Sequence, residues 1–312
     1  MRRVDGGPRA AYEPCVSSLW RFGLTLALLA PGWALADEPS PPVAEVAPAP
    51  PAASEYCHSS LEKLSNGVCY FEGGAVKGPG DTTRRTLVIF LHGLMEEGQG
   101  QEHPMQRGMV LYAKKHGFSL LVPRGRNGVG PDRKASVIAW PLGPEVREAY
   151  EAEVLAEWAA ARAEVEARRG AFDEVFVMGF SNGAYFASSL ALRDKLAVNG
   201  YAVFAGGSKS SAAGLKRAPK DAKPIFVGVA SKDGTTRDKA KELVATLGRL
   251  QWPHKSESKK VGHVVGDDHI DAALRYLRAK ARGEAEPTKK RASAAAPSKR
   301  KPTKGKRSAK GR

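Results

Sequence analysis

The amino-acid sequence predicts an α/β fold with a mostly parallel central sheet and helices on both faces of that sheet. Short runs rich in Val, Ile, Leu and Phe alternate with longer stretches of helical apolar spacing from about residue 84 to residue 281. The run at 86–91 is almost wholly apolar, as expected of a fully buried strand. A serine between two glycines, at 179–183, separates a predicted strand from a predicted helix. Such alternation is typical of a sheet whose strands are joined by helices.

The predicted elements follow one another regularly along the chain. Strands are predicted from apolar, β-branched and aromatic runs, and helices from apolar residues at helical spacing. In order, these are a strand at 86–91, a helix near 104–116, a strand at 118–123, a helix at 144–169, a strand at 174–178, a helix at 184–192, strands at 200–205 and 225–230, a helix at 237–250, a strand that leads to His263 and a last helix from 267. Right-handed crossovers place the loops after parallel strands at one edge of the sheet.

Ser181 lies at the apex of the sharp turn between the strand at 174–178 and the helix at 184–192. Gly179 and Gly183 flank it, and a side chain at either position would crowd the approach of the strand to the helix. This arrangement presents the serine and strains its backbone, as is typical of a nucleophile. The alternative is an ordinary turn serine in a scaffold that has lost its activity.

An acid and a histidine follow this serine along the chain. Asp233 lies on the loop after the strand at 225–230, and His263 lies on the loop before the last helix. A serine hydroxyl is a poor nucleophile near neutral pH and must pass its proton to a base, which histidine can be. The imidazole in turn needs a carboxylate that holds its tautomer and stabilises the imidazolium. We therefore predict that Ser181 is the nucleophile, His263 the general base and Asp233 the acid that orients it.

Both the acid and the base have competitors. Asp221 and Asp238 compete with Asp233, because Asp-Gly after a strand is also common turn chemistry. Asp238 falls inside the predicted helix at 237–250, which favours Asp233. His269 competes with His263, but its place in the first turn of the last helix favours a role in starting that helix.

In this order, the motifs resemble those of the α/β-hydrolase superfamily, in which nucleophile, acid and base follow one another as Ser, Asp or Glu, and His. The resemblance covers about residues 84–281 and implies the α/β-hydrolase fold and a serine hydrolase activity. It is closest to exported esterases of the polyhydroxyalkanoate-depolymerase, feruloyl-esterase and dienelactone-hydrolase-like groups. In this superfamily, backbone N–H groups bind the oxyanion, which implies Asn182 and either Leu94 or Met95 here.

Two further residues are expected to line the site. His92 precedes Gly93 at a strand end, where we interpret it as a hydrogen-bonded histidine that lines the site and takes no part in the triad. Trp140 lies in the stretch at 124–143, the longest irregular segment of the domain. We expect it to be either a pocket wall or a surface anchor for the loop. We see no insertion large enough for a separate lid, which favours a small or moderately sized ester.

The amino-terminal 36 residues have the pattern of a secretory signal peptide. Four arginines flank an apolar run at 22–29, and a small-residue site ends at Ala36. Retention as an anchor is the alternative. A Pro/Ala-rich spacer at 37–54 follows, then the catalytic domain at 55–283. We therefore expect an exported protein, periplasmic or extracellular, with association to a surface as a further alternative.

The cysteine content favours one disulfide. Cys15 would leave with the signal peptide, and Cys57 and Cys69 would then remain as a pair in an oxidising compartment. A hairpin turn is predicted between them at 65–67. A metal site is not expected, because only His58 lies nearby as a further soft ligand.

The basic residues gather in the carboxyl-terminal tail. Of the net charge of +16, +11 lies in residues 287–312 and +2 in residues 1–36, so residues 37–286 carry only +3. The tail, counted from residue 284, has no aromatic residue and is expected to be disordered. It could contact anionic polymers, envelope components or nucleic acid without reading bases, or it could have no partner.

Together these features predict an exported serine hydrolase that cleaves a carboxylic ester of unknown acyl group through an acyl-enzyme. The same triad also serves peptidases, amidases and acyltransferases. A different alternative is an inert hydrolase domain on a polyanion-binding surface protein. No metal is predicted, because no zinc-ligand spacing appears. No cofactor is predicted, because the glycine-rich stretches lack the strand before and the helix after them that a nucleotide site needs.

Overall fold

The computed structural model of the chain describes residues 56–77 and 83–285. The predicted signal peptide, the predicted spacer and residues 286–312 of the predicted basic tail lie outside the described residues. In the described part, no helix is both long enough and apolar enough to cross a membrane.

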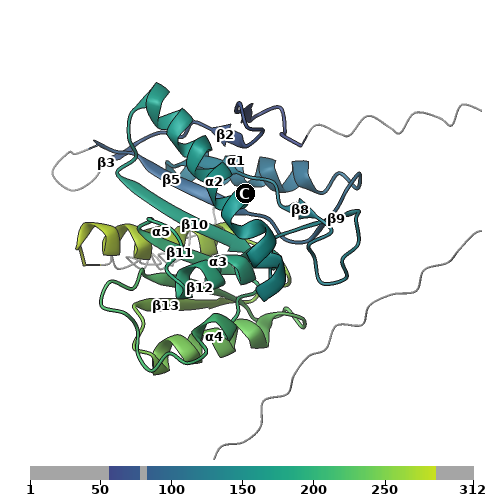
Figure 1. Cartoon of the computed structure of the whole chain (residues 1–312). Helices are drawn as coiled ribbons and strands as arrows, with labels where there is room; N and C mark the ends of the chain where they lie inside the picture. The colour runs from purple at the N-terminus through teal and green to yellow at the C-terminus, as the bar shows by residue number, and fades with distance from the viewer. Residues whose placement is uncertain (1–55, 78–82, 286–312) are drawn as a thin grey trace, which may run out of the picture. The chain divides into compact units, whose positions relative to one another are not determined.

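An eight-stranded, mostly parallel sheet forms the centre of the fold, in the order β1-β2-β7-β5-β10-β11-β12-β13 (Figure 1). β2 pairs antiparallel with both β1 and β7, and all other neighbours are parallel. In sheet order the strands are β1 (Glu62–Lys63), β2 (Cys69–Phe71), β7 (Ser119–Val122), β5 (Thr86–Leu91), β10 (Glu174–Phe180), β11 (Gly200–Phe204), β12 (Ile225–Ala230) and β13 (His254–Lys259). A separate small ladder joins β3 (Val76–Lys77) to β4 (Thr83–Arg84).

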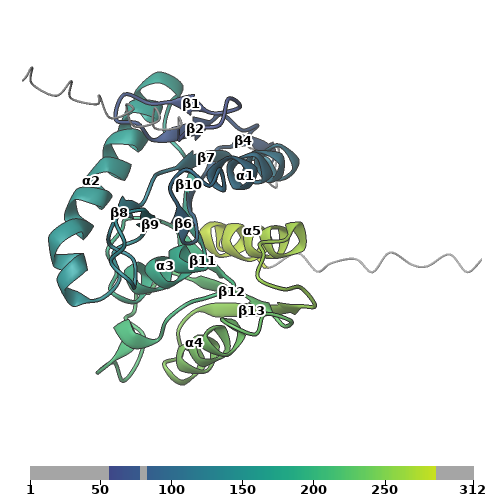
Figure 2. The same ribbon diagram turned by 90° about the vertical axis from the view of Figure 1, so that its right-hand side faces the viewer.

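Helices cover both faces of the sheet (Figure 2). α1 (Glu102–His116) and α5 (Asp267–Arg282) lie on one face, and α2 (Pro144–Arg169), α3 (Asn182–Leu192) and α4 (Arg237–Arg249) lie on the other. Each face has its own apolar core. Met109 of α1 and Ile270 of α5 belong to one core, and Trp158 of α2, Phe186 of α3 and Leu243 of α4 belong to the other.

This architecture confirms the predicted fold class. α2, β5 and β12 have the predicted bounds, α5 begins at the predicted residue, and the other predicted elements differ from the observed ones by a few residues at their ends. β10, for example, continues to Phe180, and α3 begins at Asn182. The turn between them is therefore a single residue, Ser181.

Two segments differ from the sequence-based expectation. The stretch at 124–143 is not wholly irregular, because β8 (Arg126–Asn127) and β9 (Val137–Ala139) join β6 (Met95–Glu96) in a three-stranded sheet. Strands of two or three residues are too short to show a periodic pattern. β13 carries no apolar residue and lies at the edge of the large sheet, where it pairs with β12 alone. Its position explains its polar sequence, since an edge strand is only partly covered.

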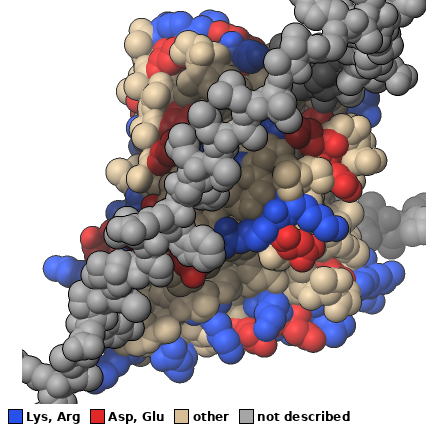
Figure 3. Space-filling view, turned by 45° about the vertical axis from the view of Figure 1, so that its right-hand side comes forward, with Lys and Arg blue, Asp and Glu red and all other residues tan. Residues whose placement is uncertain are grey.

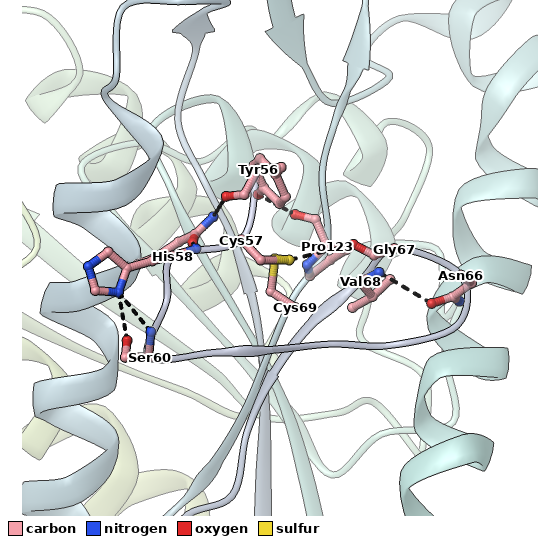
Figure 4. The surroundings of a disulfide bond; sticks show 10 residues. Tyr56, Cys57, His58, Ser60, Asn66, Gly67, Val68, Cys69 and Pro123 are labelled. Carbon is pink, nitrogen blue, oxygen red and sulfur yellow. Dashed lines mark hydrogen bonds between the residues drawn. A yellow bond between two sulfur atoms is a disulfide. The ribbon is translucent and has the colours of Figure 1, made fainter. Parts of the chain in front are cut away.

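A disulfide holds the first hairpin of the described chain (Figure 4). Cys57 and Cys69 are bonded, with an S–S distance of 2.07 Å, as the sequence predicted. The turn at 65–67 joins β1 to β2, and Gly67 has the positive φ of 85° that such a turn requires. Cys69 begins β2, so the bond ties the chain before the hairpin to the second strand of the central sheet.

The residues on either side of Cys57 are fastened to α1. Gln106 of α1 is fully buried, and its side-chain amide donates to Tyr56 O at 2.8 Å. The same amide accepts a hydrogen bond from His58 N at 2.7 Å. In addition, the Tyr56 hydroxyl donates to Pro123 O at the end of β7, at 2.9 Å. The disulfide-bonded segment therefore connects α1 to the sheet.

Loss of the disulfide is expected to lower the free energy of unfolding by about 3 kcal/mol, because the cross-link restricts the unfolded chain between two residues 12 apart. The measurement is urea unfolding of residues 37–312 as wild type and as Cys57→Ser/Cys69→Ser, each with and without dithiothreitol. Reductant should shift the wild-type midpoint to that of the double variant and leave the double variant unchanged. An unchanged wild-type midpoint would contradict the role of the bond.

Candidate active site

Ser181 occupies a strained backbone position between β10 and α3. Its φ and ψ angles are 52° and −117°, in a region that residues with a side chain rarely adopt. The two flanking glycines allow this turn to be tight. A Cβ on Gly179 would lie 2.2 Å from the Gly183 carbonyl oxygen, and a Cβ on Gly183 would lie 2.2 Å from Leu91 O. Both positions therefore require glycine, as the sequence pattern predicted.

The structure brings Ser181, His263 and Asp233 together. His263 Nε2 lies 2.9 Å from Ser181 Oγ, and His263 Nδ1 lies 2.7 Å from Asp233 Oδ2. The three residues follow β10, β13 and β12, whose carboxyl ends meet at one edge of the parallel sheet. With Nδ1 donating to the carboxylate, Nε2 is left as an acceptor for the serine proton.

Asp233 is held as a carboxylate by four hydrogen-bond donors. Its side chain is buried. It accepts the hydroxyl of Thr236, the ring of His263, and the backbone N–H groups of Thr235 at 2.9 Å and Thr236 at 3.1 Å. Burial acts to raise the pKa of Asp233, but these hydrogen bonds outweigh it and hold the pKa well below its usual range. The carboxylate is therefore charged at any pH at which the site would work.

The competing acids and the competing histidine lie elsewhere. Asp238 is exposed in the first turn of α4 and pairs with Arg237, and Asp221 lies on an exposed turn. His269 is buried in α5, packed over Phe204 at a ring distance of 6.1 Å. His263 is 41% exposed, and its ring lies 4.9 Å from that of Phe180. Only His263 thus combines contact with the serine and access to a substrate among these candidates.

The backbone N–H groups predicted to bind an oxyanion belong to residues that adjoin the nucleophile. Asn182 begins α3, and the first N–H groups of a helix have no partner within it. The next two amides are used, because Gly183 donates to His92 O and Ala184 to Ser181 O. In addition, a Cβ on Gly93 would lie 3.2 Å from the Ser181 Cβ, so the residue before Leu94 packs against the nucleophile.

Met95 is the poorer of the two alternative donors. It pairs with Ile138 in the ladder between β6 and β9. Two positions along the ladder, just past the ends of both strands, Glu97 N donates to Ser136 O at 2.8 Å. Bonded pairs alternate in an antiparallel ladder, so the Met95 N–H is directed toward Ile138. The geometry therefore favours Leu94 over Met95.

His92 does not face the pocket, contrary to the expectation that it lines the site. It is fully buried, with Nδ1 lying 2.6 Å from Gly93 O and Nε2 accepting the Gly125 N–H at 2.9 Å. These two partners fix a neutral ring with its proton on Nδ1. Burial lowers the pKa of His92 from 6.5 to about 4, in agreement with a neutral side chain. Its role is to join the loop after β5 to the loop after β7.

Trp140 is neither a pocket wall nor a surface anchor. It is fully buried and stacks on Phe186 of α3, with ring centroids 6.0 Å apart. Its indole N–H donates to His92 O at 2.8 Å, and its backbone N–H donates to the Asn182 side chain at 2.8 Å. The tryptophan therefore packs behind the nucleophile turn, where an aromatic residue with one polar group can satisfy a buried carbonyl.

An apolar pocket of about 390 Å³ opens beside His263. One wall is α1, and the others are the ends of β5 and β10 and the loop at 263–265. Its lining is Phe90, Gly93, Leu94, Met95, Gln101, Pro104, Met105, Gly108, Met109, Tyr112, Phe180, His263, Val264 and Val265. The sequence did not indicate this role for α1, because a methionine on an amphipathic helix also suits an ordinary core. Thr236 was missed too, although its place before α4 and three residues after Asp233 is a recognisable hydrogen-bonding pattern.

Comparison with known proteins finds a family model and distant structural relatives. The model described as the dienelactone hydrolase family matches residues 109–263, just under half of the chain. A carboxylesterase structure from Mesorhizobium loti is 19% identical, with 70% of this chain and 99% of that chain covered and a TM-score of 0.49. A carboxylesterase from Bacillus cereus is 15% identical, with 71% and 95% covered and a TM-score of 0.48. No curated protein matches the chain. Likenesses this distant assign no substrate.

The neutral state of His92 predicts a pH dependence of stability. Its pKa of about 4 in the folded chain lies below the unfolded value of 6.5, so the unfolded chain binds the extra proton between these pH values. Stability should therefore fall as the pH drops from 6.5 toward 4, by about 3 kcal/mol from this residue. Urea unfolding across that range should show a shallower dependence for His92→Gln than for wild type. Parallel curves for the two proteins would contradict the assignment.

Proposed function

We propose that this chain is a serine hydrolase of the α/β-hydrolase superfamily and that it cleaves a carboxylic ester through an acyl-enzyme formed on Ser181. The observation that carries this proposal is the hydrogen-bonded chain from Ser181 Oγ through His263 to Asp233, with distances of 2.9 Å and 2.7 Å. Residues 30 and 82 positions apart in the sequence meet in this geometry around Ser181, whose backbone is strained. Such a relay suits nucleophilic catalysis.

The first half of the reaction forms the acyl-enzyme. Ser181 Oγ attacks the ester carbonyl carbon while its proton moves to His263 Nε2, and the carbonyl oxygen becomes an oxyanion near the Asn182 and Leu94 N–H groups. The bond from carbon to the alcohol oxygen then breaks. His263 returns its proton to that oxygen, and the alcohol leaves.

The second half regenerates the enzyme. A water molecule gives a proton to His263 Nε2 and attacks the acyl carbon, and collapse of the second tetrahedral intermediate releases the carboxylic acid with the proton restored to Ser181. Asp233 stabilises the imidazolium in both halves, because its depressed pKa keeps the carboxylate charged.

We also propose that the protein is exported. The signal-peptide pattern at 1–36 supports this, as does the Cys57–Cys69 bond, because disulfides persist mainly in oxidising compartments. The basic tail at 287–312 would then hold the enzyme on anionic polymer by charge alone. On the face shown in Figure 3, Lys and Arg are interspersed with Asp and Glu, and residues 37–286 carry only +3. The positive charge that could bind a polyanion is therefore concentrated in the tail.

The catalytic proposal is tested with single substitutions in residues 37–312. Ser181→Ala and His263→Ala should each lower kcat for ester hydrolysis by about 10⁶-fold, because they remove the nucleophile or its base. Asp233→Asn should lower kcat by about 10⁴-fold, because the amide favours the wrong imidazole tautomer. The substrates are p-nitrophenyl esters from acetate to palmitate.

Asp238→Asn is the matched control, since Asp238 is an exposed acid on the neighbouring helix and should keep wild-type activity. Wild-type turnover that survives Ser181→Ala would overturn the acyl-enzyme mechanism. If wild type hydrolyses no ester but cleaves amides, the peptidase or amidase alternative replaces the proposal. If it cleaves neither esters nor amides and binds anionic polymer through the tail, the alternative of an inert surface protein replaces the proposal.

A further inference from the structure

The apolar pocket lies on the histidine side of the nucleophile. His263 forms part of its lining, together with Val264 and Val265. Gly93 and Leu94 form the wall beside the nucleophile, and α1 contributes Met105 and Met109 opposite. Leu94 and Val264 are among the few large apolar side chains that are exposed in the described residues, at 46% and 49%. The pocket therefore has an apolar rim as well as an apolar interior.

A second cavity lies on the other side of the nucleophile turn. It measures about 280 Å³ and is lined by Asn182, which follows Ser181, by the loop between β8 and β9, by the loop after β9 and by the first turn of α2. These are Val129, Gly130, Pro131, Arg133, Leu142, Gly143 and Val146. None of the lining residues of this cavity belongs to α1 or to the histidine loop. The two cavities thus adjoin different catalytic groups.

The chemistry of ester cleavage assigns a direction to each part of the substrate. The carbonyl carbon of the tetrahedral intermediate carries Ser181 Oγ, the oxyanion, the alcohol oxygen and the acyl substituent. The alcohol oxygen must lie near His263 Nε2, because it receives the proton held there when its bond to carbon breaks. The acyl substituent has to point away from the histidine.

We propose that the apolar pocket beside His263 holds the alcohol part of the ester, so that the substrates are esters of bulky apolar alcohols. This inference rests on the proposed function and adds its substrate class. A volume of 390 Å³ is within the range of small-molecule sites and accommodates an aryl or branched alkyl group. Methionines on α1 suit such groups of varied shape, because their side chains are unbranched and adaptable. The acyl part then lies toward Asn182 and the second cavity.

Gly108 allows the pocket to be narrowed from within. It lies on α1 in the lining, and a Cβ built on it would have no atom within 4 Å. Gly108→Leu therefore places an isobutyl group in empty space. It also replaces a glycine inside a helix, which favours the helix. Gly248→Leu is the matched control, because Gly248 lies near the end of α4, on the other face of the sheet, where the new Cβ makes an ordinary 3.9 Å contact.

The test compares two substrates that differ from ethyl acetate by one phenyl-bearing extension. Phenethyl acetate carries the phenyl group on the alcohol, and ethyl hydrocinnamate carries it on the acyl group. Both leaving groups are alkoxides of similar reactivity, so kcat/KM relative to ethyl acetate reports how each extension is bound. In Gly108→Leu, the ratio for phenethyl acetate should fall about tenfold or more, and the ratio for ethyl hydrocinnamate should keep its wild-type value. Gly248→Leu should keep both ratios.

The other outcomes separate this inference from the proposed function. A fall in the kcat/KM ratio for ethyl hydrocinnamate alone would show that the pocket holds the acyl group. Unchanged ratios for both substrates would show that it holds neither group. Each of these results overturns the inference while ester hydrolysis stands. If wild type hydrolyses none of the three esters, the proposed function fails and the inference with it. Met105→Trp narrows the same wall from a partly buried position. It serves as the blocking variant should Gly108→Leu fail to fold by circular dichroism, with the same ratios expected.

Discussion

The close approach of the α3 amino terminus to the end of β5 is the constraint on which the rest of the site depends. Gly183 N donates to His92 O at 3.0 Å, and the backbone of β5 leaves no room for a side chain on Gly183. His92 O also accepts the Trp140 indole N–H, so one carbonyl joins the nucleophile turn to the segment after β9. The strained angles of Ser181 persist because the groups on both sides of it are fixed in this way.

Two histidines near the nucleophile have opposite properties, and burial accounts for the difference. Both ring nitrogens of His92 are engaged by backbone groups, and the ring has no access to a substrate. His263 is fixed on one side by Asp233 and is open on the other, where Ser181 lies. A protein that places a buried histidine and an exposed one beside the same turn separates structural support from contact with the nucleophile. The carboxylate that distinguishes them is held charged by Thr236 and two backbone amides.

The sequence predicted the features that depend on local pattern. The order of strands and helices, the turn at Ser181, the hairpin at 65–67 and the relevance of Asp233 and His263 all follow from periodicity, glycine placement and position after a strand. The surroundings of Trp140 did not follow, because its partners His92 and Asn182 are 48 and 42 residues away in the chain. Likewise, the pocket wall on α1 and the choice of Leu94 over Met95 depend on how separate loops pair. Tertiary contacts of this kind leave no periodic signal in one sequence.

The attachment of Gln106 to the residues flanking Cys57 links the helix that lines the pocket to the formation of the disulfide. Met105, Gly108 and Met109, which form one side of the pocket, are on the same helix as Gln106, and that helix is tied to a segment closed by a cysteine pair. Oxidation of these thiols comes after synthesis. Under the proposed export, the bond behind this pocket wall would form only in a compartment where thiols oxidise, so the site that binds the substrate would be completed after transport.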